Sequence, residues 1–468
     1  MGPRKKVKLD DSVDEVDDNV TEVNKVDNLD NVEEKVEEDE LSAYEFGTSR
    51  DHTDQGTLYL DTIDRRKLDF DFEKLCSVSL ANVNVYACLT CGKYFQGRGK
   101  SSYAYLHSVD IDHHVFINLD TKRIYVLPEG YEVKSAALDD IKYVLDPVYT
   151  LEEVKNLDKA PVESYDLNHE KYQPGFVGLN NMKHNDYANV ILHMLAHIQP
   201  VRDHFILHSA SSRSELYKRM GILVRKMWNP RAFKSHVSPH ELLQQVSTES
   251  KKRFTPIKQE DPFQFFVWLA NSLMRVDKKP IGPSFQGKVK IEQLTDGGSV
   301  KGERTVPFLF LGLDLPPAPL FHQEGQPIPQ VALIDLLKKF NGSTIHELPN
   351  DRRRYSIVKL PRYVVLHIKR FSEDSLVDSR NRTVVSFSPR GLDLGHLMGE
   401  HQLYDLAANV TYELEEASEG EHSKVNWKVQ ILNKAKREWV QIQDLVVQSV
   451  RAELLFLNES YIQVWERR

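Results

Sequence analysis

The arrangement of the cysteines constrains the fold of this chain more than any other feature. All three, Cys76, Cys88 and Cys91, lie in one short stretch of a 468-residue sequence, and none follows Cys91. Proteins held together by disulfides carry paired cysteines along their length, whereas a few clustered cysteines are typical of a metal site in a reducing compartment. We therefore expect a small metal-binding domain ahead of a long region that contains no thiol.

Two histidines follow the Cys88-x2-Cys91 pair at spacings that zinc modules use. His107 comes first, and His113 follows it after five intervening residues. Two thiolates on a tight turn and two imidazoles form the tetrahedral ligand set that structural zinc prefers, and they leave no position for water. The predicted ligands of one structural zinc ion are therefore Cys88, Cys91, His107 and His113.

Other assignments of these residues stay open at the level of sequence. His114 competes with His113 as the fourth ligand, and the cysteines could instead be buried thiols beside unrelated surface histidines. Cys76 has no partner at metal spacing, so we expect it in the core, where free cysteines usually lie. A closed zinc site stabilises folding instead of activating a nucleophile, and small zinc modules gain about 10–16 kcal/mol from the metal.

Length and composition indicate a soluble protein with more than one domain. At roughly 150 residues per domain, the length allows two or three domains, and a hydrophobic share of 40% is enough to build their cores. The sequence contains no run of about 18 to 20 apolar residues and no signal-peptide-like segment. We therefore expect an intracellular protein without membrane contact.

The formal charge of −8 is concentrated near the N-terminus. Residues 1–9 carry a charge of +4, residues 10–40 carry −13, and residues 41–468 carry only +1. Non-specific binding to nucleic acid needs a basic excess. The nearly neutral remainder therefore gives no case for a general nucleic-acid binder, and direct RNA contact stays open.

The first 50 residues are predicted to be a disordered tail. Its basic cluster of Arg4, Lys5, Lys6 and Lys8 is of the kind that nuclear import receptors bind, or else is simply a solvated terminus. In the acidic part, valines recur every three or four residues, which would place them on one helical face. Poor helix formers and like charges favour disorder in the free chain, with a partner-induced helix as the alternative.

Local patterns divide the remainder into two folded domains of the α+β class. Between residues 55 and 145, the segments VNVYACL, HHVFINL and RIYVL predict strands, and SSYAYLHS predicts a short helix. Residues 146–171, which are charged and contain two prolines, predict a linker with room for one helix. From 172 to 468, helical segments such as DPFQFFVWLANSLM come first, and strands such as RYVVLHIKRF and SYIQVWE come later.

The run CLTCGKYFQGRGKSSYAYLHS, with its four candidate ligands, resembles the zinc-finger domain found in ubiquitin-specific proteases. In active relatives such a finger can hold the free C-terminus of ubiquitin. The resemblance places Arg98, in the turn Gly97-Arg98-Gly99, where these domains often carry an arginine that contacts this tail.

Three stretches of the C-terminal region resemble the sequence boxes of ubiquitin-specific proteases. GLNNMKHNDYAN at 178–189 is similar to the cysteine box, QEDPFQFF at 259–266 to the helix that follows it, and LPRYVVLHIKRF at 360–371 to a core strand. The resemblance implies a papain-like domain with thumb, palm and reduced fingers. The paired cysteines that usually bind a second zinc in the fingers are missing.

The resemblance also assigns the catalytic positions, and most hold residues of the wrong type. Asp186 occupies the nucleophile position, Asn426 the histidine position and Gln443 the orienting position, while Asn181 matches the oxyanion-hole asparagine. Isopeptide hydrolysis of this kind needs a thiolate, a base and an orienting residue. A lone carboxylate cannot replace them, because aspartic proteolysis needs two carboxylates. We expect no enzyme activity, with an unrecognised mechanism as the alternative.

The whole chain resembles one particular family. The resemblance rests on the finger, the degenerate protease domain, the basic N-terminus and the segments LDFDFEKLCSVSL and YIQVWERR. This family comprises the ubiquitin-specific-protease-like splicing factors associated with the U4/U6.U5 tri-snRNP. The resemblance implies a nuclear, non-catalytic scaffold whose domains dock spliceosomal tri-snRNP proteins. The alternative is a receptor for ubiquitin or a ubiquitin-like protein without hydrolase activity.

Overall fold

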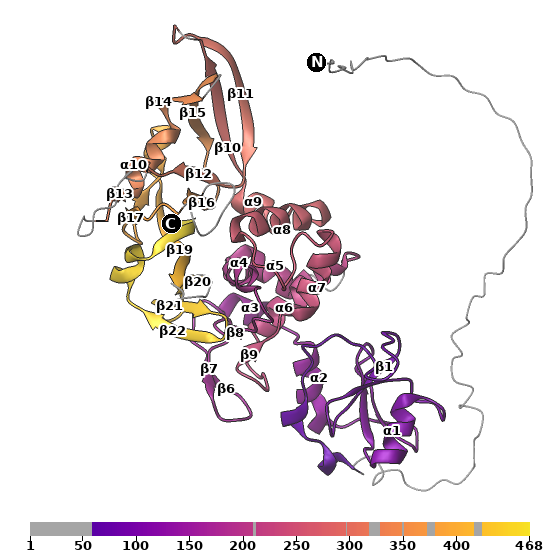
Figure 1. Ribbon diagram of the computed structural model, residues 1–468. Helices are drawn as coiled ribbons and strands as arrows, with labels where there is room; N and C mark the ends of the chain where they lie inside the picture. The colour runs from indigo at the N-terminus through magenta and orange to yellow at the C-terminus, as the bar shows by residue number, and fades with distance from the viewer. Residues whose placement is uncertain are drawn as a thin grey trace, which may run out of the picture. The chain divides into compact units, whose positions relative to one another are not determined.

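The structure, a computed structural model, describes residues 59–208, 212–295, 297–317, 328–348, 351–371, 380–415 and 424–468 (Figure 1). The predictions for the tail, residues 1–50, fall outside this part of the chain. Residues 54–468 form one compact unit, in which the finger and the C-terminal region have separate hydrophobic cores. Within the described ranges, we find no helix that is both long and apolar enough to cross a bilayer.

The finger is built on a five-stranded antiparallel sheet with the strand order β2-β1-β3-β4-β5. Both faces of this sheet are covered, since Val85 and Ala87 of β1 join one core while Tyr86 and Cys88 join the other. The elements are η3 (Leu60–Thr62), η4 (Arg65–Lys67), β1 (Val85–Cys88), β2 (Tyr94–Gln96), α1 (Tyr103–Ile111), β3 (Val115–Asn118), β4 (Ile124–Val126), β5 (Tyr131–Val133), η5 (Ala136–Leu138) and α2 (Asp139–Leu145).

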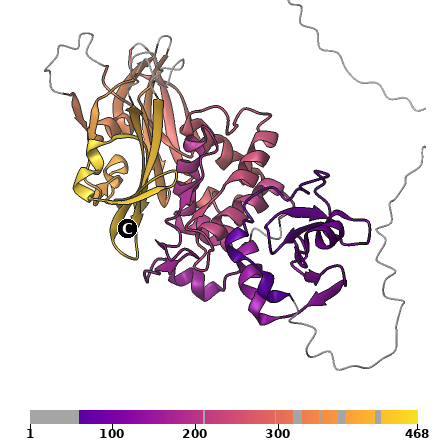
Figure 2. The ribbon, with the colours of Figure 1, turned by 60° about the horizontal axis from the view of Figure 1, so that its bottom comes forward.

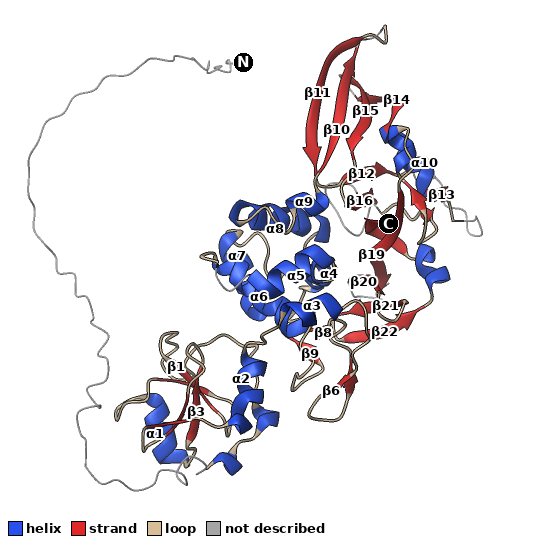
Figure 3. Cartoon of the chain, turned by 180° about the vertical axis from the view of Figure 1, so that it is seen from behind, coloured by secondary structure: helices blue, strands red, loops and turns tan. Residues whose placement is uncertain are grey.

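A group of helices follows, drawn in blue in Figure 3. Its central helix, α4, is buried along its whole length, as expected for a helix that is apolar on nearly all sides. It contacts α5, α8 and strand β20. The helices are α3 (Leu151–Asn156), α4 (Asp186–Ala196), α5 (Gln199–His208), α6 (Glu215–Met227), α7 (His240–Glu249), α8 (Pro262–Val276) and α9 (Gly282–Phe285).

The strand-rich part is drawn in orange to yellow in Figure 2. Its described residues form an eight-stranded and a four-stranded sheet. The larger follows the order β12-β16-β23-β19-β20-β21-β22, with β18 paired to β19, and the smaller follows β11-β10-β15-β14. Strands of the larger are β12 (Leu311–Asp314), β16 (Tyr363–Lys369), β18 (Leu392–Asp393), β19 (Leu403–Glu415), β20 (Lys424–Asn433), β21 (Glu438–Gln443), β22 (Val446–Val450) and β23 (Glu459–Arg467). Those of the smaller are β10 (Gly287–Leu294), β11 (Val300–Phe308), β14 (Asn341–Leu348) and β15 (Asp351–Lys359).

Short elements complete the C-terminal region. Among the described residues, these are strand pairs and short helical segments: β6 (Ser164–Tyr165) with β7 (Lys171–Tyr172), β8 (Gly178–Leu179) with β9 (His236–Val237), β13 (Gln330–Ala332) with β17 (Val384–Ser386), α10 (Leu333–Leu337), η7 (Lys338–Phe340), η8 (Gly395–Met398) and η9 (Ala452–Leu457). The large sheet has a core on each face, because side chains alternate along a strand. Trp427 and Val429 pack with the helices, whereas Trp439 and Trp465 join the second core.

The segment predicted to be a linker, residues 146–171, is packed against the helices. Helix α3 begins with a capping box, in which Thr150 and Glu153 accept hydrogen bonds from each other's backbone amides. Val154 is buried in the large core. Asp158 accepts two hydrogen bonds from the buried Arg202, at 2.7 and 2.9 Å. The segment is therefore part of the folded body and not an extended spacer.

A buried ion pair joins the finger to helix α6. Lys226 Nζ donates to Asp71 Oδ1 at 2.9 Å and to the carbonyl oxygen of Phe70 at 2.6 Å. The side chains of Lys226 and Asp71 are each only 10% exposed, so separating them would leave an uncompensated buried charge. Phe233, from the C-terminal region, is a member of the finger's own core.

Candidate functional site

The end of a strand, a turn, a helix and the loop after that helix bring Cys88, Cys91, His107 and His113 together. Cys88 ends β1, and the turn that carries Cys91 closes when Gly92 N donates to the carbonyl oxygen of Cys88 at 2.9 Å. Gly92 has a φ of +76°, and a Cβ atom there would lie 2.2 Å from a backbone oxygen, so only glycine fits. His107 lies on α1, and His113 follows its end.

The spacing of the four ligand atoms fits a tetrahedral zinc ion. All four lie within 4.8 Å of one another. Cys88 Sγ is 3.6 Å from His113 Nδ1, Cys91 Sγ is 3.5 Å from His107 Nε2, and the two nitrogens are 3.0 Å apart. Zinc bond lengths of about 2.3 Å to sulfur and about 2.0 Å to nitrogen imply sulfur–nitrogen edges of about 3.5 Å. The chemistry and the geometry of the donor set therefore suit zinc.

His114, which competes for the fourth ligand position, and Cys76, which is expected in the core, both have other partners. His114 places Nδ1 2.8 Å from the carbonyl oxygen of Leu127 and Nε2 2.9 Å from Asp112 Oδ1, so both of its nitrogens are engaged. Cys76 is fully buried and accepts a hydrogen bond from the Ser79 amide at 3.4 Å. Neither residue belongs to the ligand cluster among the described residues.

Arg98, the candidate contact for a ubiquitin tail, lies against the finger's own aromatic core. Its guanidinium carbon is 4.5 Å from the centre of the Tyr125 ring, a distance that suits a cation–π interaction. Tyr125 in turn packs edge-on against Tyr86. One face of this cation is therefore already covered by the protein.

Asp186, at the nucleophile position, begins helix α4 and is anchored by amide donors. Gln259 Nε2 lies 2.9 and 2.7 Å from its two carboxylate oxygens, and the backbone amide of Trp427 donates to Oδ2 at 3.2 Å. The residue is only 5% exposed. Burial raises the pKa of the Asp186 carboxyl, although these hydrogen bonds act in the opposite direction.

Asn426 and Gln443 lie on neighbouring strands of the large sheet. Asn426 lies on β20 between Val425 and Trp427. The backbone amide of Trp427 donates to Asp186, and the carbonyl oxygen of Val425 accepts from Gln259 at 3.0 Å. Gln443 ends β21, where it is paired with Val446 of β22. Asp186 therefore reaches strand β20 beside the histidine position.

Asn181, the retained oxyanion-type asparagine, already donates to a carboxylate. Its Nδ2 is 2.9 Å from Asp444 Oδ2, and Asn189 Nδ2 is 2.9 Å from the other oxygen of Asp444. Asn181 also accepts a hydrogen bond from the Asn185 amide at 3.1 Å. The Asn181 amide, which would have to donate to an oxyanion, is therefore already hydrogen-bonded within the domain.

Two comparisons with family models cover most of the described chain. The model described as "Ubiquitin carboxyl-terminal hydrolase" matches residues 177–465, and "Zn-finger in ubiquitin-hydrolases and other protein" matches residues 76–138. The first match alone spans more than half of the sequence. This chain belongs to the ubiquitin carboxyl-terminal hydrolase family.

Several proteins, some of them with splicing names, are similar to this chain over most of its length. "Probable mRNA-splicing protein ubp10" of Schizosaccharomyces pombe is 45% identical, with 88% of each chain covered. Human "Ubiquitin carboxyl-terminal hydrolase 39" is 40% identical, covering 90% of this chain and 81% of its own. A solved structure, "Crystal structure of an essential yeast splicing factor", superposes with a TM-score of 0.76 and 34% identity, covering 88% of this chain and 99% of that one.

These matches confirm the predicted family and fold class. A finger of the ubiquitin-hydrolase type precedes a mixed helix and sheet domain of the ubiquitin-specific-protease type. The zinc-finger match and the Cys/His cluster together indicate zinc binding. The close relatives include splicing factors.

The sequence did not predict a role for Gln259 or Asp444. In the structure, Gln259 donates hydrogen bonds to Asp186, and Asp444 accepts one from Asn181. Gln259 opens the quoted QEDPFQFF box, and Asp444 directly follows Gln443. Their positions beside the recognised boxes were the available signal. Their roles depend on contacts between segments far apart in the chain, since Asp444 meets Asn181 and Gln259 meets Asp186.

The polar residues around the nucleophile position form hydrogen bonds between segments of the domain. The two carboxylates, Asp186 and Asp444, are held by different amide donors and share no hydrogen bond among the described residues. An aspartic pair would instead have to share a proton. No cysteine follows Cys91 in the sequence, so the domain contains no thiol nucleophile.

Proposed function

We propose that this chain is a non-catalytic docking protein of pre-mRNA splicing, which helps to assemble or hold the U4/U6.U5 tri-snRNP in the nucleus. The observation that carries the proposal is its 45% identity, over 88% of both chains, to a protein named as a splicing protein. The solved splicing-factor structure, which superposes over 88% of the chain, supports the same assignment.

The non-catalytic part of the proposal rests on the state of Asp186. Acyl transfer in this family requires a nucleophile whose proton a neighbouring base removes. Asp186 is instead buried and hydrogen-bonded to Gln259 and to the Trp427 backbone, and the base and orienting positions hold Asn426 and Gln443. Each of these residue types can donate or accept hydrogen bonds, but neither can take up a proton at neutral pH.

The finger contributes a structural zinc ion to this docking body. Cys88, Cys91, His107 and His113 would hold one ion, and a four-residue site leaves no open position for water. When bound, zinc supplies a cross-link between β1, α1 and the loop after α1. The finger then acts as a rigid surface attached to α6 through Lys226 and Asp71.

Purification of the tagged chain from nuclear extract tests the proposal. Co-purification of the U4, U5 and U6 small nuclear RNAs with tri-snRNP proteins is expected, and a ubiquitin fluorogenic substrate should remain uncleaved. Turnover of that substrate would overturn the non-catalytic assignment. Absence of the small nuclear RNAs, together with micromolar ubiquitin binding in calorimetry, would support a ubiquitin receptor instead.

Nuclear location is tested separately through the basic cluster near the N-terminus. Changing Lys5→Ala together with Lys6→Ala should weaken nuclear accumulation of a fluorescent fusion, because import receptors bind such clusters. An unchanged nuclear signal would remove the role assigned to this cluster.

A further inference from the structure

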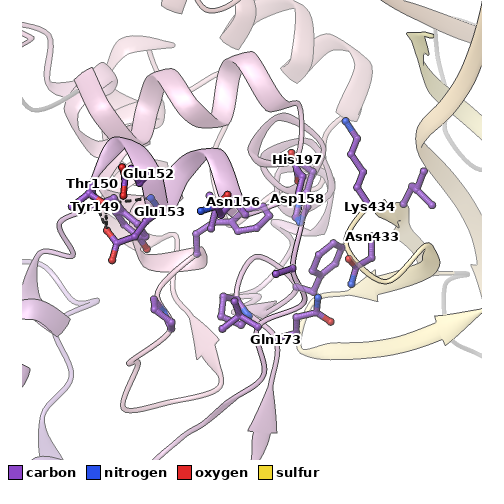
Figure 4. Close-up of a pocket in the computed structure, with 18 of the residues that line it drawn as sticks. Tyr149, Thr150, Glu152, Glu153, Asn156, Asp158, Gln173, His197, Asn433 and Lys434 are labelled. Atoms are coloured by element: carbon purple, nitrogen blue, oxygen red, sulfur yellow. Dashed lines mark hydrogen bonds between the residues drawn. The ribbon is translucent and has the colours of Figure 1, made fainter.

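A hollow of about 430 Å³ lies away from both sites described above. It is formed by helix α3 and the loop after it, the segment 173–176, the end of α6 and the β20–β21 turn (Figure 4). Neither the zinc ligands nor Asp186 lines it. Its volume falls within the range of about 300–1,000 Å³ that ligand sites occupy. Aromatic side chains form much of its wall: Tyr143, Tyr149, Phe176 and Trp228.

The aromatic wall is held in place by its own hydrogen bonds. Trp228 Nε1 donates to the carbonyl oxygen of Ala196 at 3.1 Å, and Arg202 lies over its ring at 4.7 Å. Tyr149 donates to the carbonyl oxygen of Arg225 at 2.7 Å. A wall fixed in this way costs little further ordering when a ligand binds.

Asn433, which lines the hollow, has a buried amide group. The residue is only 1% exposed, and its Nδ2 has no hydrogen-bond partner among the described residues. Its Oδ1 accepts from the Lys436 amide at 3.2 Å, which fixes the orientation of the amide group. An unmatched buried donor is unfavourable, so a ligand that brings an acceptor to this amide would bind more tightly.

His197 offers an acceptor at the same end of the hollow, where Figure 4 shows it with Asn433 and Lys434. Its Nδ1 is 2.7 Å from the carbonyl oxygen of His193, so this nitrogen carries the proton. Nε2 is buried and has no partner within the described ranges. Because burial lowers the pKa of His197 to about 4, the ring is neutral and Nε2 is an acceptor.

The charged residues of the lining favour a cation at the opposite end. The lining holds three carboxylates and one ammonium group: Glu152, Glu153, Asp158 and Lys434. Asp158 pairs with Arg202, Lys434 pairs with Glu466, and Glu153 caps α3. Glu152 is exposed and makes no ion pair with any described residue. Its carboxylate is therefore available to a ligand.

A second hollow of about 490 Å³ lies next to the first and shares the lining residues Gln173 and Phe176 with it. Peptide bonds present a carbonyl acceptor and an amide donor along an extended chain. These are the groups that Asn433 Nδ2 and His197 Nε2 require.

We propose that this hollow binds a short linear segment of a partner protein, which inserts an apolar side chain between the aromatic walls and places a lysine or arginine beside Glu152. The inference deepens the proposed docking function and rests on it, because a docking protein needs a surface that recognises its partner. The proposed ligand is a basic peptide, and selection of acidic peptides would contradict the proposal.

Selection of phage-displayed random peptides of about 12 residues on the full chain tests this proposal. Two matched variants locate the binding. Ala160→Trp fills the hollow, since Ala160 is an exposed lining residue, whereas Lys159→Trp adds the same ring to a neighbour outside the lining. Selected peptides should join a large apolar residue to a nearby lysine or arginine. In fluorescence polarisation, Ala160→Trp should weaken them at least tenfold, and Lys159→Trp should leave them unchanged.

A charge exchange tests the position of the basic residue. Glu152→Lys should weaken the selected peptides about tenfold, and replacing the peptide's lysine by glutamate should restore binding to this variant. Glu170→Lys, which changes an exposed residue outside the lining, is the control. Should Ala160→Trp lower the melting temperature, Val162→Trp, which changes another exposed lining residue, replaces it.

Acidic peptides, or peptides that bind Ala160→Trp as well as the wild type, would overturn the inference. Small nuclear RNA co-purification, measured on the same wild-type chain, separates it from the proposed function. Failure of peptide selection with intact co-purification removes only the peptide site. Specific peptide binding without co-purification removes the splicing role and leaves the site.

Discussion

The polar residues of the finger suit a metal ion, whereas those around the nucleophile position of the protease-like domain bind one another. In the finger, all four ligand atoms lie within 4.8 Å of one another, and the residue types are those that zinc requires. In the protease-like domain, the frame around the nucleophile position is intact, but Asp186 is tied to Gln259 and to the Trp427 backbone. The finger has the residue types that a zinc ion requires, whereas the nucleophile position of the protease-like domain holds a hydrogen-bonded aspartate.

This difference follows from what each set of residues does for folding. A metal ligand contributes directly to the stability of a small domain, because metal binding and folding are coupled. A catalytic nucleophile contributes little to stability, so it can be exchanged once its replacement finds hydrogen-bond partners. Asp186 has such partners. We therefore expect loss of a zinc ligand to unfold the finger, and we expect a substitution at the nucleophile position to leave the protease-like domain folded.

Removal of one zinc ligand should have the largest effect. Cys91→Ala leaves three ligands, and we expect the finger to lose most of the roughly 10–16 kcal/mol that metal binding contributes. This loss is comparable to the whole stability of an ordinary domain, about 5–15 kcal/mol. We expect the wild-type full chain to hold one zinc and the variant to hold none, with rapid proteolysis between residues 59 and 145. The measurements are metal analysis by mass spectrometry and limited proteolysis.

Cys76→Ala is the matched control, because Cys76 is buried but lies outside the cluster. It should keep its zinc and lose only about 1 kcal/mol from a small cavity. A Cys91→Ala protein with normal zinc content and an unaltered finger would show that the cluster is not a metal site.

The sequence predicted the arrangement of the finger residues more fully than that of the nucleophile position. The four candidate ligands lie within 26 positions, and the spacing of cysteines and histidines along a turn, a helix and a loop is readable locally. The choice between His113 and His114 was not, because it depends on the hydrogen bonds of His114 to Leu127 and Asp112. Residue types identified the candidates, and packing separated them.

Long-range partners were beyond the reach of sequence patterns. Strands such as β16 and helices such as α8 lie where the segments RYVVLHIKRF and DPFQFFVWLANSLM predicted them. The pairings of Gln259 with Asp186 and of Asp444 with Asn181 join residues 73 and 263 positions apart. No periodicity encodes such pairs, because they arise only when α4, α8 and the large sheet pack together.

Removal of the Asp186 carboxylate should have a moderate effect on stability and none on function. Asp186→Ala leaves the Trp427 amide without its acceptor and Gln259 with one partner fewer, which costs about 1–3 kcal/mol. Urea unfolding measures this loss. Splicing activity and tri-snRNP association should remain near wild type at a temperature where the variant is folded. Loss of splicing with fold and partners intact would identify Asp186 as a functional carboxylate.

The pH dependence of stability should show a smaller effect of the same residue. Because burial raises the folded-state pKa of Asp186, its contribution to stability is fully present below the unfolded pKa of about 3.9 and declines as pH rises toward the folded pKa. The decline is about 1.4 kcal/mol for each unit by which the pKa is raised.

Comparison with Asp186→Asn separates the pH-dependent contribution of Asp186 from that of the other titrating groups. The unfolding free energy of the wild type, minus that of the variant, should fall between pH 4 and pH 7 in urea titrations. A difference that stays flat would mean that Asp186 titrates alike in both states. A rising difference would mean that its hydrogen bonds outweigh burial.

Rebuilding the catalytic residue types should have the smallest effect of all. Asp186→Cys alone gives a thiol with a pKa near 8.5, only a few per cent of which is thiolate at neutral pH. Adding Asn426→His and Gln443→Asp restores the types, but a base must lie within about 3 Å of the thiol. In this structure the contact between position 186 and β20 runs through the backbone amide of Trp427, and Asn181 donates to Asp444. We therefore expect the triple variant to cleave a ubiquitin fluorogenic substrate no faster than Asp186→Cys, with an active family member as the positive control. Turnover well above that of the single variant would show that only the residue types were lost, and that the architecture of the site still supports catalysis.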